Sequence, residues 1–267
     1  MTDERGLSLE RALAKTEADA EATLKAATAV ATSLKRFRAA AQAGNLRDLR
    51  AAVAAAEQAL GALRQQFANA KEGWDFDEDG YFTGGNYARE LLETAKSMNV
   101  RLFEQDDRLY SYPVLVRVLA NERAVLIDKT RERRLRPSVL VARLRDLQKR
   151  PARFRPEAFL ASLAEAYDAL DAAKSGKMDA GQGGVVRLLD VYSLLTLLPG
   201  QSKEYSRQEF ARDVYLLDGS GLSQTRDGRA FSLPASTGTK QASGTIRVVT
   251  EDGSEKVYYG ISFSPAE

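Results

Sequence analysis

A heptad repeat of apolar residues constrains the fold of this chain more than any other feature of its 267 residues. Two interleaved rows carry the repeat: Leu46, Val53, Leu60 and Phe67 in one, and Leu49, Ala56, Leu63 and Ala70 in the other. Apolar residues at the a and d positions of successive heptads predict a helix that packs along another helix. A weaker row of the same period precedes it, formed by Leu13, Ala20, Ala27, Leu34 and Ala41.

The two predicted helices should be joined by a turn at Gly44-Asn45. Glycine is favoured just after a helix, and asparagine is favoured at the N-cap of the next one. Residues 1–74 are therefore expected to form an antiparallel helical hairpin, in which alanine lets the helices approach closely. One interpretation is an arm that packs only locally. The other is an arm for oligomerisation or for docking a protein partner.

Residues 75–174 alternate helical and strand patterns and predict a small mixed α/β domain. Because Pro113 cannot donate to a β-ladder, the strand that contains it should lie at an edge or carry a bulge. The glycine-rich residues 175–184 are the candidate linker to the next domain. The expected elements are a helix over Tyr87–Met98, strands over Val100–Glu104, Arg108–Leu119 and Arg123–Lys129, and helices beginning at Pro137 and Pro156.

Residues 185–267 predict two helices followed by strands. The first helix is expected around Val185–Leu198, and Ser206 with Glu209 is a capping box that opens the second. Glu251-Asp252-Gly253 is a turn signal, and the strands that it joins are expected over Thr245–Thr250 and Val257–Phe263. This layout resembles that of a winged-helix module. The predicted fold class is α+β, with a helical hairpin, a mixed middle domain and a winged-helix-like module.

The chain contains neither histidine nor cysteine. Histidine is the side chain that titrates nearest neutral pH, and cysteine supplies thiolate nucleophiles and soft metal ligands. Their absence excludes a Ser-His-Asp triad, a Cys-His dyad, a zinc ribbon and an iron–sulfur cluster. The remaining carboxylate, lysine and hydroxyl groups fall into no catalytic arrangement. We therefore expect a protein that is not an enzyme.

Residues 129–155 carry eleven basic and two acidic side chains, a net charge of +9, although the whole chain carries only +2. Arginine dominates this basic segment, and its planar guanidinium can bind phosphate oxygens through two hydrogen bonds. Candidate contacts to a DNA or RNA backbone are Arg131, Arg133, Arg134, Arg136, Arg143 and Arg150. The alternatives are neutralisation of the acidic residues on either side, within the protein or across an oligomer, and binding to an anionic membrane.

Two further stretches are candidate sites. The polar loop 232–244 contains Lys240, a secondary candidate for a phosphate contact. Asp75, Asp77 and Asp79, followed by Gly80, resemble the start of an EF-hand calcium loop. The twelfth position holds Asn86 where that family has glutamate, so the alternative is an acidic connecting loop. Calcium or magnesium is the only cofactor that this motif suggests, and magnesium would imply a carboxylate-metal hydrolase.

The sequence thus predicts a non-catalytic, nucleic-acid-binding accessory subunit that recruits or positions a partner enzyme, as in a bacterial DNA-processing or defence complex. The protein partner would bind through the hairpin. The alternative is a coiled-coil adaptor or oligomerisation protein that does not bind nucleic acid. With no secretory signal, no long apolar run and no cysteine, we expect it in the cytoplasm and not on a membrane.

Overall fold

The computed structural model describes residues 8–106, 108–150, 152, 154–175, 184–234 and 244–264. The chain divides into two compact units. One comprises Met1–Val100 and Val118–Leu144, and the other comprises Arg101–Arg117 and Arg145–Glu267. Both contain helices and antiparallel strands, so the predicted α+β class is confirmed. Whether the chain folds as three independent domains, with boundaries at residue 74 and at 175–184, stays a prediction.

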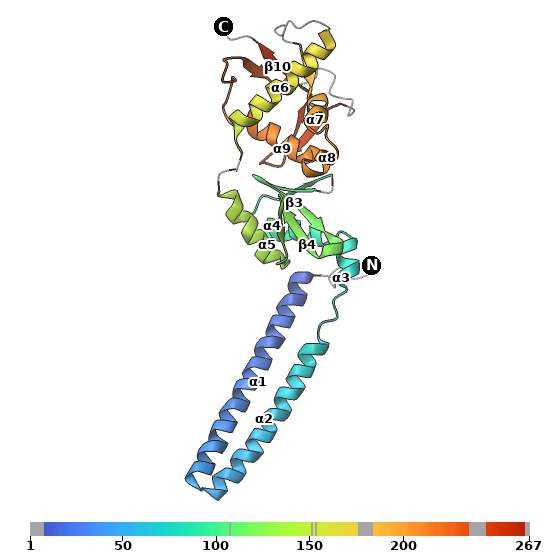
Figure 1. Ribbon diagram of the computed structural model, residues 1–267. Coiled ribbons are helices and arrows are strands. Elements are labelled where there is room, and N and C mark those ends of the chain that lie inside the picture. The colour runs from blue at the N-terminus through green and yellow to red at the C-terminus, as the bar shows by residue number, and fades with distance from the viewer. Residues whose placement is uncertain are drawn as a thin grey trace. The chain divides into compact units, whose positions relative to one another are not determined.

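The first unit begins with the predicted helical hairpin, which is confirmed (Figure 1). Helix α1 spans Leu9–Ala43 and helix α2 spans Leu46–Glu72. Gly44 adopts the left-handed conformation, with φ of 68°, and its N–H bonds to the carbonyl groups at the end of α1. The Asn45 side chain then accepts from the N–H of Asp48 and caps α2.

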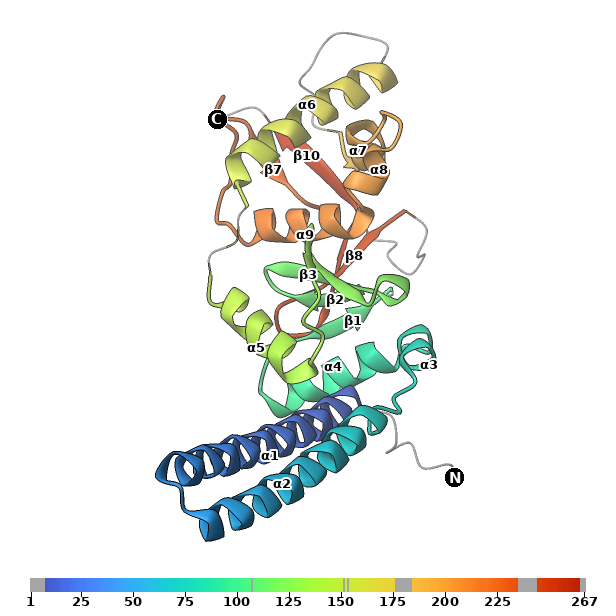
Figure 2. The same ribbon diagram turned by 60° about the horizontal axis from the view of Figure 1, so that its bottom comes forward.

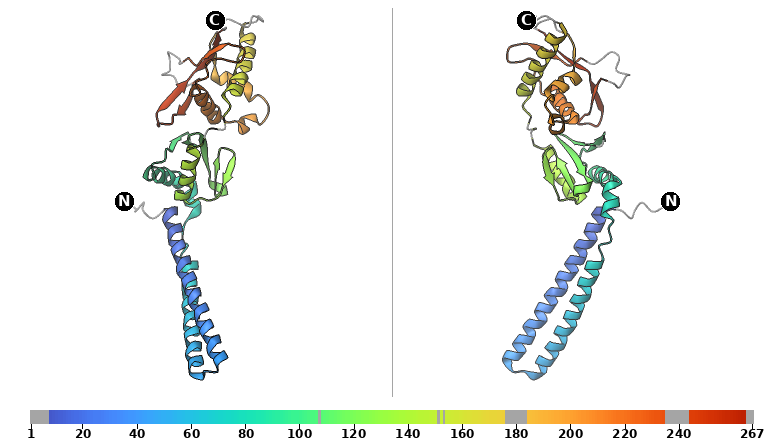
Figure 3. Two further views of the ribbon diagram at one scale, coloured as in Figure 1. Left: turned by 90° about the vertical axis from the view of Figure 1, so that its left-hand side faces the viewer. Right: turned by 45° about the vertical axis from the view of Figure 1, so that its right-hand side comes forward.

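The predicted seam between the hairpin helices is correct for only one of its two rows. Ala56 is buried, and Leu49, Leu63 and Ala70 are half-buried, so this row faces α1. The row that begins at Leu46 is exposed instead. On α1, Val30 and Ala40 are buried, whereas Leu34 of the predicted seam is exposed. Small residues such as Ala52 and Ala59 complete the inner face of α2. In Figure 3 the two helices run side by side along their length.

The rest of the first unit consists of short elements around an aromatic cluster. Tyr81, Phe82 and Tyr87 contact one another through their rings and are buried, together with Leu91. Helix α5 begins at Pro137, as predicted, and buries Leu140, Val141 and Leu144. The elements are α3 (Glu78–Thr83), α4 (Asn86–Ser97), a 3-10 turn η2 (Ala120–Glu122), β4 (Ala124–Ile127), β5 (Thr130–Glu132) and α5 (Pro137–Gln148), whose last four residues belong to the second unit.

The single strand predicted over Arg108–Leu119 is two strands. β2 (Arg108–Ser111) and β3 (Val114–Leu119) are antiparallel, with Tyr110 opposite Leu115, and the chain turns at Tyr112-Pro113. Proline cannot donate a ladder hydrogen bond, so it ends a strand as readily as it bulges one. β1 (Phe103–Gln105) pairs with the other side of β2.

The C-terminal part of the second unit surrounds its main core (Figure 2). Strand β10 lies between β6 and β7 in a three-stranded antiparallel sheet, and β8 and β9 form a separate hairpin. Phe210, Leu163, Leu188 and Ile261 are among its fully buried side chains. The elements are α6 (Pro156–Ser175), β6 (Val186–Arg187), α7 (Leu188–Leu195), α8 (Gln201–Glu204), α9 (Arg207–Asp218), β7 (Ala230–Ser232), β8 (Ile246–Val249), β9 (Glu255–Tyr258) and β10 (Gly260–Ser264).

Two predictions for this part were wrong in detail. The helix expected from Val185 begins at Leu188, because the two residues before it pair with β10. The strand expected over Val257–Phe263 is split between β9, which pairs with β8, and β10, which returns to the larger sheet. The capping box of Ser206 and Glu209 is confirmed at the start of α9. Most of the candidate linker, residues 176–183, lies outside the described residues.

Candidate interaction surfaces

The carboxylate of Glu132 on β5 binds several residues of the basic segment. Its carboxylate is only 7% exposed and accepts from the backbone N–H groups of Arg133 and Arg134, each at 2.9 Å. The guanidinium of Arg134 lies 2.8 Å from the same carboxylate, and Arg143 from α5 forms a second ion pair with it. A buried carboxylate needs such partners because losing its hydration is costly. These arginines therefore stabilise the fold where the sequence suggested a phosphate contact.

Arg136 binds two carboxylates of the hairpin. Its guanidinium lies 2.6 Å from the carboxylate of Glu10 and 2.5 Å from that of Glu17. Glu10 also accepts from the N–H and the hydroxyl of Ser138, both at 2.9 Å, at the N-terminus of α5. Burial alone would raise the pKa of Glu10, but the hydrogen bonds from Ser138 and Arg136 outweigh it and lower that pKa. Arg136 thus joins the base of the hairpin to α5.

A third carboxylate, that of Glu90 on α4, binds the N-terminus of α1 at the base of the hairpin. Glu90 accepts from the hydroxyl of Ser8 at 2.7 Å and from the N–H groups of Leu9 and Glu10 at 2.8 and 3.1 Å. It also accepts from the hydroxyl of Tyr81. A carboxylate at this position satisfies N–H groups that have no partner within the helix and complements the helix dipole.

Four of the six arginines predicted to bind phosphate are therefore ion-paired, since Arg131 also lies 2.7 Å from Glu122. Arg133 and Arg150 are exposed, and neither has a carboxylate partner among the residues that the structure describes. Lys240 lies outside those residues. The sequence could not reveal Glu10 or Glu17 as partners, because more than a hundred positions separate them from Arg136.

The aspartate motif forms the start of a helix. Asp77 is the N-cap of α3 and accepts from the N–H of Gly80 at 3.0 Å, and Asp79 is ion-paired with Arg123. α3 occupies positions that a calcium loop would use for ligands. Within the described ranges, no three acidic side chains converge as a metal site would require. Asp75, Asp77 and Asp79 therefore support no metal proposal.

The C-terminal half of helix α9, the second of the predicted helix pair, contacts other elements of the second unit. The ring of Tyr215 packs 5.0 Å from that of Tyr112, and its hydroxyl accepts from the N–H of Glu251 at 3.3 Å. Asp218 accepts from Lys256 at 2.6 Å and from the hydroxyl of Tyr258 at 2.8 Å. A helix that reads DNA presents free polar and basic side chains to the major groove. These contacts occupy the C-terminal half of α9, whereas Arg207 at its N-terminus is exposed.

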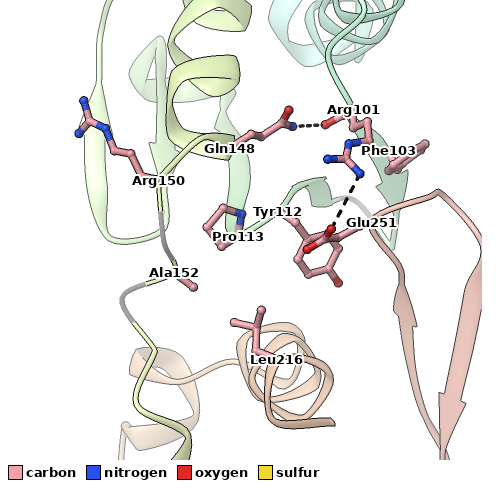
Figure 4. Close-up of a pocket in the computed structure, with 9 residues that line it drawn as sticks. All are labelled: Arg101, Phe103, Tyr112, Pro113, Gln148, Arg150, Ala152, Leu216 and Glu251. Atoms are coloured by element: carbon pink, nitrogen blue, oxygen red, sulfur yellow. Dashed lines mark hydrogen bonds and ion pairs between the residues drawn. The ribbon is translucent and has the colours of Figure 1, made fainter. Parts of the chain in front are cut away.

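A pocket of about 140 Å³ in the second unit is lined by residues from β1, the β2–β3 turn, α9 and the β8–β9 turn (Figure 4). Arg101 lies 3.8 Å from Glu251 across it, and Gln148 donates to the Arg101 carbonyl at 2.6 Å. Figure 4 shows the side chain of Arg150 pointing away from Glu251 and Tyr112. Of the charged residues that line this pocket, Arg101 and Glu251 are thus paired with each other.

The apolar row of α2 that does not face α1 is exposed along the helix. Leu46, Val53, Leu60 and Phe67 retain 67, 37, 49 and 61% of their accessible surface. They recur at the heptad interval and form one stripe on the helix. Single exposed apolar residues are ordinary, whereas a row of them on one face of a helix is a candidate interaction surface.

A shallow groove lies at the middle of this stripe. It is lined by Leu60, Leu63 and Phe67 together with the charged side chains of Glu57 and Arg64, and Gly61 forms part of its floor. Apolar residues bordered by both signs of charge are typical of helices that pair with another helix. The sequence identified the row but assigned it to the wrong neighbour, because heptad spacing alone does not say which row faces α1.

None of the helices in the described part of the chain is long and apolar enough to cross a membrane. Comparison with protein-family models, with curated proteins and with solved structures finds no match to this chain.

Proposed function

We propose that this protein is a non-catalytic adaptor that assembles through its helical hairpin. The observation that carries the proposal is the exposed row of Leu46, Val53, Leu60 and Phe67 on α2. Fully burying a side chain of this size contributes about 1.5–3 kcal/mol. The monomeric hairpin gains little of that energy from this row, whereas a partner laid along α2 would gain it.

The internal use of the basic segment supports the adaptor over a nucleic-acid-binding subunit. Glu132, Glu10 and Glu17 neutralise Arg134, Arg143 and Arg136 within the chain. Phosphate binding would require these ion pairs to be replaced, which offsets the counterion release that drives such binding.

We further propose that the C-terminal part, predicted over residues 185–267, is a winged-helix-like module used for structure or protein contact. Support comes from the order of α7 and α9 followed by β7 and β10, with β10 between β7 and β6. The contacts of Tyr215 and Asp218 favour a role other than reading DNA with α9.

Affinity purification of the full-length chain from its source cells tests the adaptor function. The comparison is between the wild type and a variant in which Leu46, Val53, Leu60 and Phe67 are all glutamine. A matched control carries Leu24→Gln and Leu34→Gln, which replace exposed leucines of α1. We expect the α2 variant to lose copurifying chains, including untagged copies of itself, and the control to retain them. Retention of every partner by the α2 variant would contradict the proposal.

Binding to a DNA or RNA backbone is the second candidate function. It is favoured by the exposed side chains of Arg145, Lys149 and Arg150, for which no ion pair is found within the described residues. Binding measured over a salt series should fall steeply if these residues meet phosphates. The matched comparison is Arg145→Glu with Lys149→Glu against Arg38→Glu with Arg47→Glu on the hairpin. Equal affinity of both variants would exclude this site.

A further inference from the structure

We propose that α2 packs against α2 of a second copy of this chain, with the two helices antiparallel about a two-fold axis between Leu60 and Gly61. The proposal deepens and rests on the adaptor function, because it names the occupant of the same apolar row. A two-fold interface must be self-complementary, so that each residue meets its counterpart twice. In this arrangement, residues equally far before and after the axis lie at the same level.

The charged row beside the apolar stripe meets this condition. Arg50, Glu57, Arg64 and Lys71 recur every seven residues and are all exposed. With the axis between Leu60 and Gly61, Glu57 lies at the level of Arg64 of the second copy, and Arg64 at the level of its Glu57. Two symmetric ion pairs therefore lie near the centre of the interface, because the charged row falls on the helix between the apolar row of Leu60 and the small row of Gly61.

The sizes of the side chains are complementary in the same register. Val53, Leu60 and Phe67 lie at the levels of Ala68, Gly61 and Ala54 of the second copy, so each large side chain meets a small one. Ala54 and Gly61 are exposed and Ala68 is half-buried, and all three lie next to the charged row of α2. Large side chains fitting beside small ones let two helices approach closely and bury the apolar row.

Gly61 is an independent indication of a close approach. It lies in the middle of α2, where glycine weakens a helix relative to alanine. A Cβ added at Gly61 would meet nothing within 4 Å, so nothing in the described hairpin requires a glycine there. A second helix seated against this position does require it, because Leu60 of the second copy would occupy the space.

Other antiparallel registers that pair Glu57 with a basic residue are poorer. Pairing Glu57 with Lys71 puts the axis at Arg64, so that two arginines face each other at the centre. Pairing Glu57 with Arg50 moves the axis next to Val53, and Phe67 then extends beyond the first residue of the other α2. Of these three registers, the one centred between Leu60 and Gly61 pairs Glu57 with Arg64 at the centre, places large side chains beside small ones and keeps the apolar row within the length of α2.

This register also contains one repulsive contact. Arg50 lies at the level of Lys71 of the second copy at each end of the interface. Like charges at this distance oppose association. Lys71→Glu should therefore tighten the dimer, although it replaces an exposed residue and leaves the apolar row unchanged.

Sedimentation equilibrium of the purified full-length chain tests the proposal. We expect the wild type to dimerise, and Glu57→Arg or Arg64→Glu alone to raise the dissociation constant about tenfold, since each turns two attractions into repulsions. The double variant, Glu57→Arg with Arg64→Glu, should restore the wild-type value. Ala55→Arg, at an exposed position about 160° around α2 from Glu57, is the matched control and should change nothing.

The variant Gly61→Leu tests whether a loss of the dimer could be caused by unfolding of the hairpin. Leucine has a higher helix propensity than glycine, so the hairpin should melt at a higher temperature while the dimer is lost. If Glu57→Arg and Arg64→Glu both leave the dissociation constant unchanged, the register is wrong, although the adaptor function can still hold. A chain that is monomeric at every concentration would overturn the second copy as occupant. Failure of the adaptor function would show itself separately, as unchanged capture of partners by the glutamine variant.

Discussion

The helical hairpin and the C-terminal core differ in how far they bury their large apolar side chains. Around α6, α7 and α9, residues such as Leu163, Leu188 and Phe210 have no more than traces of exposed surface. On α2, the only buried residue is Ala56, and Leu46, Leu60 and Phe67 are exposed. The core therefore obtains its stability from within the chain, whereas much of the apolar surface of α2 stays exposed to solvent in the single chain.

The difference shows that two regions with comparable helix-forming sequences can bury very different shares of their apolar side chains. A helix in a protein is stabilised mainly by packing of its apolar face, since isolated helices are marginal in water. In the hairpin, small residues and caps hold α1 against α2, and carboxylates such as Glu90 fix its base. The exposed row is thus not needed to form the hairpin, and it is free to take part in assembly.

The largest expected contrast comes from the same substitution in the two regions. Leu163→Ala should lower the free energy of unfolding by about 2–5 kcal/mol, because it leaves a cavity in a fully buried site. Leu60→Ala in a dilute sample should change it by less than about 0.5 kcal/mol, because Leu60 is half exposed. Urea denaturation monitored by circular dichroism measures both values. Similar losses in the two variants would contradict the contrast.

The next largest contrast is expected at alkaline pH, where the core should lose stability and the hairpin should not. Burial raises the pKa of Tyr110 in the second unit to about 12, and the nearby Asp106 adds to the shift. Below pH 10 the tyrosine is neutral in both states and the stability is fully present. As the pH rises from 10 to 12, the unfolded chain loses its proton first, so the core is destabilised.

The hairpin helices contain no tyrosine and should keep their helical signal over this range. Near-ultraviolet circular dichroism reports the core. The far-ultraviolet helical signal that remains after the near-ultraviolet signal is lost reports the hairpin helices, because α6, α7 and α9 of the core also contribute to the full signal. Tyr110→Phe should move the loss of the near-ultraviolet signal to higher pH. A transition at the same pH in this variant would show that Tyr110 does not contribute.

A smaller effect is expected at the base of the hairpin. Glu90→Ala removes the acceptor for Ser8, Leu9 and Glu10 and should destabilise the first turn of α1 by about 1–2 kcal/mol. Hydrogen exchange should quicken there and remain unchanged around Gly44. Glu93→Ala, an exposed position of the same helix, is the matched control. Uniform loss of protection along α1 would mean that Glu90 holds the whole hairpin.

Local signals in the sequence predicted local structure well. Gly44 and Asn45 end one helix and begin the next through contacts within a few residues, and Ser206 with Glu209 does the same for α9. Pro113 signalled an interruption, but whether a proline bulges a strand or turns the chain depends on what pairs beyond it.

Features that depend on distant residues could not be predicted. The partners of Arg136 lie on the hairpin, far away in the sequence, so a basic segment with a net charge of +9 looked free to bind phosphate. The choice between the Leu46 row and the Leu49 row depends on which face α2 turns toward α1. Heptad spacing specifies two rows, and only the packing of α1 decides which of them remains exposed.

The most direct test of the second-copy interface uses the absence of native cysteine. With the axis between Leu60 and Gly61, the two copies of residue 60 are offset by about 1.5 Å along the helices, and the two copies of residue 53 by about 22 Å. A disulfide requires Cα atoms within about 7 Å. Under mild oxidation, Leu60→Cys should therefore form a covalent dimer and Val53→Cys should not, while Val53→Cys mixed with Ala68→Cys should cross-link. Efficient cross-linking of Val53→Cys to itself would contradict the antiparallel interface.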